Sequence, residues 1–271
     1  MKKYELIEEG KLFRIRALKD FDDVKEGELG GLVSGEHNLS LEGNCWIFEN
    51  AIVFGNAQIS GNAKVFGNAR ISSNAKIYGD AQILGNAKVY GNAKISGNAG
   101  IFGNARIYGN TKVSNNVKIY GNASICNNAK VYDNAIVFGN AKVSGNAKVY
   151  EDARISGNAK VFGNTKVSGN SWVHGNVLVY NNARVYGDAQ IYGDAVISGD
   201  SIVTKKVNTF GNAFCYDITV TDKHIQIGCQ QHLKSEWLHF TDEEIIKMDG
   251  KKALNFWRLF KPLAINMVLF D

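Results

Sequence analysis

A six-residue phrase of the form Gly-Asn-Ala-Lys-Val-Tyr repeats from Gly43 to Thr204 without an insertion or a deletion. This stretch spans 162 residues, or 27 hexads, and we number the six positions of each hexad from its first residue. The fifth position always holds Ile or Val, and the third holds Ala in most hexads. Six residues are too few for a helical return between strands, so successive coils must stack into a solenoid.

The third to fifth positions usually alternate small apolar, polar and branched apolar residues, which is the period-two pattern of a strand with one buried face. The Gly-Asn pair that follows predicts a turn, because Gly adopts positive φ without steric cost and Asn tolerates it better than most residues. We therefore expect strands of about three residues, with the third and fifth positions pointing inward and the fourth and sixth outward.

These hexads resemble those of the hexapeptide-repeat proteins, with Val or Ile in the aliphatic place and Ala in the small place. The resemblance implies a left-handed parallel β-helix of triangular section with 18 residues per coil, and hence nine coils. This chain departs from the family's phrase by placing Tyr, Phe or Ser directly after the aliphatic residue and Gly one step later. Left-handed coiling rests on the resemblance alone, because crossovers between parallel strands are generally right-handed. A flat coil of twelve residues is the alternative that the sequence period leaves open.

Serine recurs at the sixth position at multiples of twelve residues, in Ser60, Ser72, Ser96, Ser144, Ser156 and Ser168. Phe or Tyr mostly lies midway between these serines. In an 18-residue coil this spacing usually places Ser above or below a ring, so we expect bulky rings to be kept apart.

The two ends of the chain lack the hexad, and a solenoid needs atypical caps where its edges are open. We therefore predict an all-β, single-stranded parallel β-helix over residues 43–204, an N-terminal cap over 1–42 and a small α+β cap over 205–271. In the C-terminal cap, short strands are expected at 218–220 and 224–227. The run from Thr241 to Glu244 has the form of a capping box that opens a helix. Gly250 should end that helix, and Pro262 should interrupt a second one that begins near residue 252.

The segments Phe21 to Val33, Asn38 to Ser40 and Gly43 to Ile47 look like the N-terminus of YdcK-like hexapeptide proteins, a resemblance that extends from residue 4 to about residue 204. That group includes a protein labelled a transferase and many proteins carried by phages and prophages. The resemblance therefore implies acyl transfer, or a phage protein that engages a host component. It carries no catalytic motif that can be transferred to this chain.

Several classes of protein are disfavoured by composition. The four cysteines have no CxxC spacing and no paired pattern, so neither a metal site nor a disulfide framework is expected, and no cofactor is indicated. The N-terminus is charged rather than apolar, and no apolar run approaches the ~20 residues of a membrane span. We expect a cytoplasmic protein with no membrane partner.

Basic residues concentrate in the solenoid, where 15 Lys or Arg face 8 Asp or Glu. Fourth positions 18 residues apart should stack, which predicts an uninterrupted column that we call the basic ladder: Lys76, Lys94, Lys112, Lys130, Lys148, Lys166 and Arg184. Like charges at strand spacing repel, and a polyanion would relieve that repulsion while neighbouring Tyr rings stack on bases. Nucleic acid, a phosphorylated small molecule and an acidic protein surface all fit this chemistry. The alternative is that these lysines only keep a long sheet soluble.

Acyl transfer is the activity implied by the hexapeptide-repeat resemblance. Those enzymes use a His as general base in a cleft between the solenoids of a trimer, usually beside a loop that juts from a coil. His174 is the only His in the solenoid and lies two residues after Trp172, so it is the catalytic candidate. The alternative is that it merely fills an aromatic position. Because 27 uninterrupted hexads leave no loop to wall a cleft, the sequence favours a non-enzymatic solenoid that binds a polyanion or a host protein. An acyltransferase, and a structural protein that self-assembles through its C-terminal helix, are the two alternatives.

Overall fold

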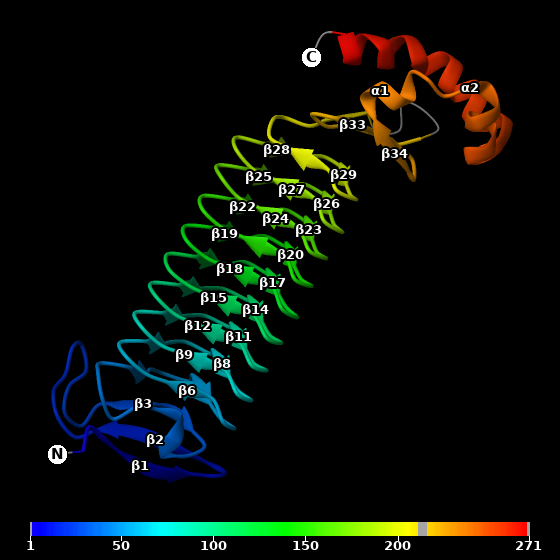
Figure 1. Cartoon of the computed structure of the whole chain (residues 1–271). Coiled ribbons are helices and arrows are strands. Elements are labelled where there is room, and N and C mark those ends of the chain that lie inside the picture. The colour runs from blue at the N-terminus through cyan, green and yellow to red at the C-terminus, as the bar shows by residue number, and fades with distance from the viewer. Residues whose placement is uncertain (1, 211–215, 270–271) are drawn as a thin grey trace.

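A computed structural model describes residues 2–210 and 216–269. The protein is a stack of coils with a unit of strands and helices at its C-terminal end (Figure 1). Each hexad forms a two-residue strand at its fourth and fifth positions. Within the stack each such strand pairs in parallel with the strands three before and three after it, and the strands of the first and last coils have one such partner. Paired residues lie 18 apart, as in Lys94 and Lys112. The 18-residue coil and the β-helix are therefore confirmed, and the twelve-residue coil is excluded. The left-handed sense stays a prediction.

The hexad strands form three sheets of nine strands each. Sheet 1 contains β4 (Trp46–Ile47), β7 (Lys64–Val65), β10 (Gln82–Ile83), β13 (Gly100–Ile101), β16 (Lys118–Ile119), β19 (Ile136–Val137), β22 (Arg154–Ile155), β25 (Trp172–Val173) and β28 (Gln190–Ile191). Sheet 2 contains β5 (Ile52–Val53), β8 (Arg70–Ile71), β11 (Lys88–Val89), β14 (Arg106–Ile107), β17 (Ser124–Ile125), β20 (Lys142–Val143), β23 (Lys160–Val161), β26 (Leu178–Val179) and β29 (Val196–Ile197). Sheet 3 contains β6 (Gln58–Ile59), β9 (Lys76–Ile77), β12 (Lys94–Ile95), β15 (Lys112–Val113), β18 (Lys130–Val131), β21 (Lys148–Val149), β24 (Lys166–Val167), β27 (Arg184–Val185) and β30 (Ile202–Val203).

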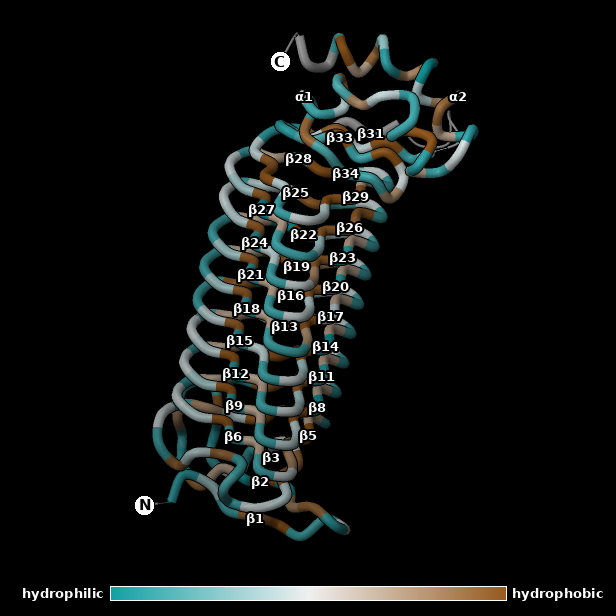
Figure 2. Tube along the Cα trace, turned by 45° about the vertical axis from the view of Figure 1, so that its right-hand side comes forward, coloured by the Kyte–Doolittle hydropathy of each residue, from teal (hydrophilic) through white to brown (hydrophobic). Residues whose placement is uncertain are grey.

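The core is a continuous apolar column made by the third and fifth positions, which are buried in every coil. Figure 2 shows hydrophobic positions recurring at the same place along the stack. Small third-position residues let the three sheets approach one another, and Ile or Val fills the space between them. Three buried hydroxyls interrupt this column, those of Thr111, Thr165 and Ser171. None of the three has a hydrogen-bond partner in the described part of the chain.

The corners between sheets depend on backbone with positive φ at the first position of the hexad. Gly169 has φ 68°, and a Cβ built there would lie 2.6 Å from the backbone nitrogen of Gly187 in the next coil.

The Asn at the second position of the hexad has a role that the sequence did not reveal. Its side-chain amide donates to the Asn one coil later, as from Asn110 to Asn128 at 3.2 Å and from Asn146 to Asn164 at 3.0 Å. These amide ladders tie the coils together along each corner.

Aromatic rings at the sixth position stack on each other, so the expectation that serine keeps them apart is wrong for many of them. Tyr90 and Tyr108 have ring centroids 5.0 Å apart with an interplanar angle of 4°. Further stacked pairs occur at Phe48–Phe66, Tyr120–Phe138, Tyr132–Tyr150 and Phe162–Tyr180. The spacing of ~4.8 Å between strands falls within the range of ring stacking, so successive rings attract rather than collide.

The N-terminal segment forms β1 (Tyr4–Glu9), β2 (Leu12–Ala17), β3 (Leu29–Val33) and the short helix η1 (Glu36–Asn38). The first three strands are antiparallel, but β3 also pairs in parallel with β5, so the ladder of sheet 2 begins before the first hexad. Lys3 is buried beneath this end and donates to the carbonyls of Gly43 and Cys45 at 2.9 and 2.6 Å. Burial lowers the pKa of Lys3.

The C-terminal unit has a second, separate core. Its sheet contains β31 (Asn208–Phe210), β32 (Ile218–Val220), β33 (His224–Ile227) and β34 (Gln230–Leu233), followed by α1 (Lys234–Trp237) and α2 (Asp242–Leu269). Two groups of the last coil donate hydrogen bonds to this unit, the Ser198 hydroxyl to Gln231 at 2.7 Å and the Thr204 backbone amide to Asp222 at 2.8 Å. The strands expected at 218–220 and 224–227 are confirmed.

The helix α2 begins with the predicted capping box, in which the Thr241 amide donates to Glu244 at 2.9 Å and the Glu244 amide donates back to Thr241 at 3.3 Å. It kinks at Asp249 and Gly250, whose backbone angles are not helical. The expectation that Pro262 interrupts the helix is wrong, because α2 continues to Leu269. Phe260 and Ala264 flank the proline and are both buried in the C-terminal core. Their packing offsets the ~3 kcal/mol that a proline costs inside a helix.

Candidate functional site

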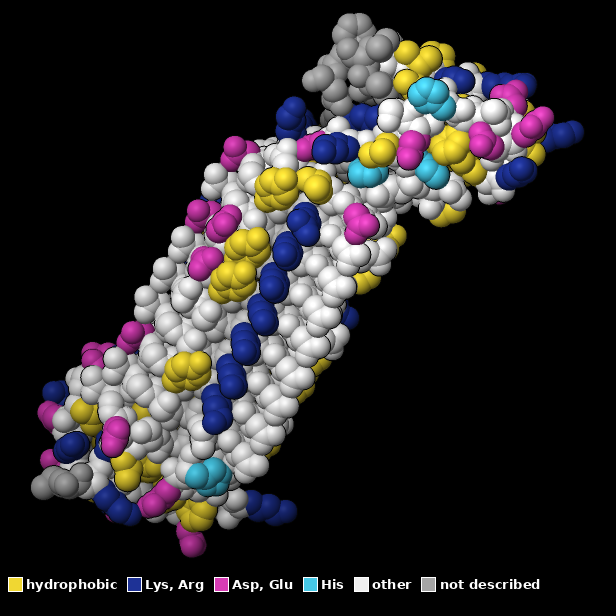
Figure 3. All heavy atoms as spheres, viewed as in Figure 1, with side chains coloured by type: hydrophobic (Ala, Val, Ile, Leu, Met, Phe, Trp, Pro, Cys, Tyr) yellow, Lys and Arg dark blue, Asp and Glu magenta, His cyan; other side chains and the backbone are white. Residues whose placement is uncertain are grey.

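The basic ladder runs along the outer face of sheet 3. Lys112 pairs with Lys94 on one side and Lys130 on the other, and the same register continues from Lys76 to Arg184. At ~4.8 Å per step, the seven positions span about 29 Å. Figure 3 shows them as one unbroken row of Lys and Arg side chains across this face. The structure thus brings together all seven residues that the sequence assigned to one column.

The ladder carries charge that its surroundings do not neutralise. Within residues 2–210 and 216–269, none of its seven side chains forms an ion pair. Lys64 on sheet 1 provides a contrast, because Asp22 and Asp23 of the N-terminal segment bind its ammonium at 2.7 and 2.6 Å. Hydrogen bonds to these two carboxylates raise the pKa of Lys64. The protein therefore neutralises an outward lysine near its cap and leaves the ladder free.

Neutral side chains border the ladder on both sides. One border is an amide ladder at the second position, which runs from Asn74 to Asn182. The other is the sixth-position column, in which Tyr78 and Tyr186 are each 41% exposed and Tyr132 stacks on Tyr150. The ladder and these rings together form a basic, partly aromatic strip, which we call the ladder face.

Acidic residues begin at the corner beyond the tyrosines. Burial is the main cause that raises the pKa of Tyr132, with further contributions from Tyr150 and from the carboxylates of Asp133 and Glu151. These carboxylates hold their own hydrogen bonds along the corner, since the Asn115 amide donates to Asp133 at 3.0 Å and the Gly169 amide donates to Glu151 at 2.5 Å. The ladder face is thus bounded by negative charge at one edge.

His174 lies on sheet 1, away from the ladder, in an aromatic group. Its ring centroid is 4.6 Å from that of Trp172 and 5.7 Å from that of Tyr192. Trp172 is 39% exposed and its indole N–H donates to the Ser156 hydroxyl at 3.1 Å. Among the described residues no carboxylate is hydrogen-bonded to the imidazole, so none of them orients His174 as a catalytic base.

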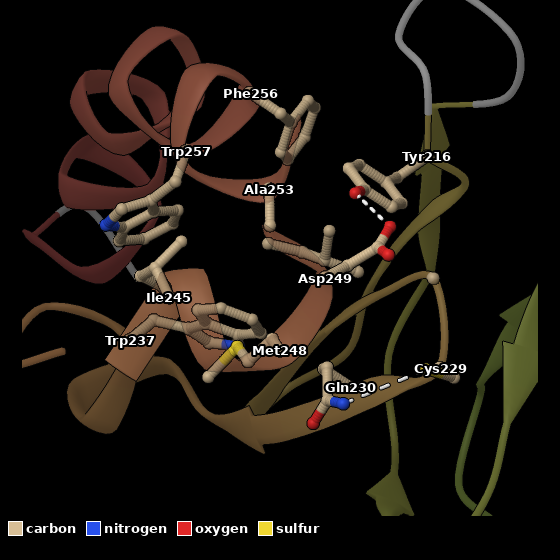
Figure 4. Close-up of a pocket in the computed structure, with 12 residues that line it drawn as sticks. Tyr216, Cys229, Gln230, Trp237, Ile245, Met248, Asp249, Ala253, Phe256 and Trp257 are labelled. Carbon is tan, nitrogen blue, oxygen red and sulfur yellow. Dashed lines mark hydrogen bonds between the residues drawn. The ribbon is translucent and has the colours of Figure 1, made fainter. Parts of the chain in front are cut away.

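A cavity of about 250 Å³ lies inside the C-terminal unit, and sequence reasoning did not identify it (Figure 4). Its walls are mostly apolar and aromatic and include Trp237, Phe256 and Trp257. At its rim the Tyr216 hydroxyl donates to Asp249 at 2.5 Å, so these polar groups bind each other. The aromatic residues were visible in the sequence, but only the kink at Asp249 and the turn before Gln230 place them around a space.

Two features are absent from the described residues. In that part of the chain, no group of three or more His, Cys, Asp or Glu side chains is placed to hold a metal ion. None of its helices is both long enough and apolar enough to cross a membrane.

Comparison with known proteins places the solenoid among known repeats. A family model described as the YdcK β-solenoid repeat matches residues 57–73 and 189–204, both inside the stacked coils. The chain thus carries repeats similar to those of the YdcK β-solenoid. A relative from Escherichia coli K12, described as "Uncharacterized acetyltransferase YdcK", is 41% identical over 69 residues. That match covers 20% of this chain and 21% of the relative, about a fifth of each protein.

Proposed function

We propose that this protein is a non-enzymatic binding protein that holds single-stranded nucleic acid along its ladder face. The observation that carries the proposal is the row of seven cationic side chains without an ion-pair partner in the described structure. A rigid solenoid fixes the backbone positions of these cations in a line before any ligand arrives, so binding costs the protein little backbone entropy.

A single strand suits this face better than an acidic peptide because of the neighbouring rings. Exposed Tyr78 and Tyr186 border the ladder, and base stacking on an aromatic side chain contributes about 1–3 kcal/mol per base. Neutralising phosphates releases condensed counterions, and the affinity for a single strand should fall with salt at a slope of about −0.7 per phosphate contacted. Seven contacts would give a slope near −5 on logarithmic axes, following the same relation.

The test is binding of a fluorescent oligonucleotide of about 16 nucleotides, the upper end of the site sizes typical of such grooves. The ladder variant is Lys112→Glu, Lys130→Glu and Lys148→Glu combined. The matched control is Lys88→Glu, Lys142→Glu and Lys160→Glu, which makes the same change in net charge on the neighbouring sheet 2. We expect the ladder variant to lose binding and the control to retain most of it.

Equal losses in both variants would show that net charge alone attracts the strand, and the proposal would fail. It would also fail if the wild-type protein bound a poly-glutamate peptide as tightly as the oligonucleotide, because the ladder would then serve an acidic protein surface. Circular dichroism of both variants checks that the solenoid is intact.

Acetyl transfer is the second candidate, favoured by the description of the relative as an acetyltransferase and by the exposed Trp172 beside His174. An imidazole at this place would act as the general base for an acceptor amine or hydroxyl. Incubation with acetyl-CoA and a panel of amine and hydroxyl acceptors, comparing wild type with His174→Ala and a His239→Ala control, tests it. Turnover lost only in His174→Ala would establish the enzyme, and absence of turnover in the wild type would exclude it for these acceptors.

A further inference from the structure

The column of fourth positions on sheet 2 is broken at one place. Arg106 and Lys142 are the neighbours of Ser124 in the parallel register, so a short hydroxyl side chain replaces a long cation. The same hexad has Cys126 at its sixth position, in the column where Tyr108 precedes it. A long cationic side chain is therefore missing at Ser124, and a small residue follows Tyr108 in the neighbouring column.

A polar hollow of about 400 Å³ lies beside Ser124 on the outer surface of sheet 2. Its walls are the guanidinium-bearing side chain of Arg106, the rings of Tyr90 and Tyr108 and the amide ladder at the second position. Ser124 also lines it. No carboxylate lines this hollow, in contrast to the acidic corner near the ladder face.

The amides of this wall keep hydrogen-bonding capacity for a ligand. The Asn104 amide donates to Asn122 at 3.2 Å, and the Asn122 amide donates to Asn140 at 3.0 Å. Each carboxamide nitrogen carries two N–H groups, and the ladder uses one of them. The second N–H can therefore point to an acceptor in the hollow.

Tyr108 reaches across the broken hexad. Its pKa is raised, chiefly by hydrogen bonding to the Cys126 side chain and then by burial, while the Ser124 side chain lowers it. One face of its ring stacks on Tyr90 at 5.0 Å. In the sixth-position column the next two residues on its other side are Cys126 and Ser144, so no second ring occupies that face.

We propose that this hollow, which we call the Ser124 hollow, is a binding site for the phosphate monoester of a small hydroxylated molecule. Arg106 is exposed and, within the described residues, forms no ion pair, so its planar guanidinium is free to bind a phosphate with two parallel hydrogen bonds. The Asn and Tyr side chains supply donors for hydroxyl groups. The site lies on a different sheet from the ladder face and does not rest on the nucleic-acid proposal.

The test is isothermal titration of the full chain with ribose 5-phosphate, inorganic phosphate and ribose. Ser124→Lys restores the residue type that the repeat favours, so it should fold, and its side chain fills the hollow. The control is Gln82→Lys, which adds the same charge at a fourth position of sheet 1. We also use Arg106→Gln, which removes the proposed phosphate ligand.

We expect one ribose 5-phosphate per chain, with affinity at least tenfold above that for inorganic phosphate or ribose. Ser124→Lys should weaken binding at least tenfold although it adds a positive charge that attracts phosphate, and Gln82→Lys should not weaken it. Arg106→Gln should also bind ribose 5-phosphate at least tenfold more weakly than the wild type. Undetectable binding by the wild type, undiminished binding by Ser124→Lys, or equal affinity for inorganic phosphate would each overturn the proposal.

Discussion

Lys112 and Lys130 are direct partners in the parallel ladder of sheet 3, and both side chains are exposed on the same face. Two ammonium groups at strand spacing repel each other, and neighbours on either side repeat the arrangement. The ladder therefore stores an electrostatic cost in the free protein, which a bound anion or high salt would reduce.

Neutralising one member of the ladder should stabilise the free protein at low ionic strength. We expect Lys130→Gln to raise the free energy of unfolding by about 0.2–1 kcal/mol, because it removes repulsion by Lys112 and Lys148. The matched control is Lys118→Gln, since Lys118 pairs with Gly100 and Ile136. Denaturant unfolding at ~20 and ~500 mM salt measures both, and the gain should vanish at the higher salt. An equal gain in Lys118→Gln would contradict the repulsion.

The close approach of corners in successive coils should make Gly169 intolerant of a side chain. In Gly169→Ala, a strained φ costs roughly 1–2 kcal/mol and the new Cβ also presses on the backbone of Gly187. Gly10→Ala is the control, because Gly10 has φ 67° and open space around its Cβ position. Thermal unfolding should show a larger loss for Gly169→Ala. Equal losses would mean that φ strain alone determines the effect.

Removing a buried, unpaired hydroxyl should stabilise the core. Thr165 is fully buried, and its hydroxyl has no partner among the described residues. We expect Thr165→Val to raise the free energy of unfolding by about 1 kcal/mol, since Val has the same shape without the desolvated polar group. Thr221→Val should instead lose stability, because the Thr221 hydroxyl bonds with the His224 backbone at 3.2 and 3.0 Å. Chemical denaturation measures the free energy of unfolding of both variants. A lower value for Thr165→Val than for the wild type would refute the expected gain.

Acid should weaken the start of α2 through Glu244. Hydrogen bonds from the Thr241 backbone and then its side chain lower the pKa of Glu244 in the folded chain. This contribution to stability is therefore complete above the unfolded pKa of about 4.3, and it is lost as the pH falls through the lower folded value. Glu244→Gln should be less stable than wild type at pH 7 and should lose less helical signal between pH 6 and 3. The measurement is the circular dichroism of both proteins as a function of pH. Parallel curves would refute the link between Glu244 protonation and helix stability.

Much of the fold was predictable because its determinants are local. The Ile or Val at each fifth position and the Gly-Asn pair after the strand specify a strand, a turn and an inward face within six residues. The seven residues of the basic ladder followed from counting in steps of 18, once the resemblance supplied the coil length. Paired residues such as Lys94 and Lys112 confirm that register.

Other features depended on contacts that no single hexad encodes. The rings of Tyr90 and Tyr108 stack because strand spacing and ring-stacking distance coincide. The helix α2 passes through Pro262 because residues on both sides of the proline are buried in the C-terminal core. In both cases a rule about one residue was outweighed by packing against distant parts of the chain.

The repeat, its inward and outward faces and the column of charge were all predictable from the residue order, since each depends on periodicity along the chain. Which charges stay unpaired and where the surface opens became known from the folded structure. Asp22 and Asp23 reach Lys64 but not the ladder, and Ser124 opens a hollow because of the side chains one coil away. Neutralisation and cavity shape depend on the distances between side chains in space. The stacking of the coils sets these distances, and they cannot be read from the order of residues alone.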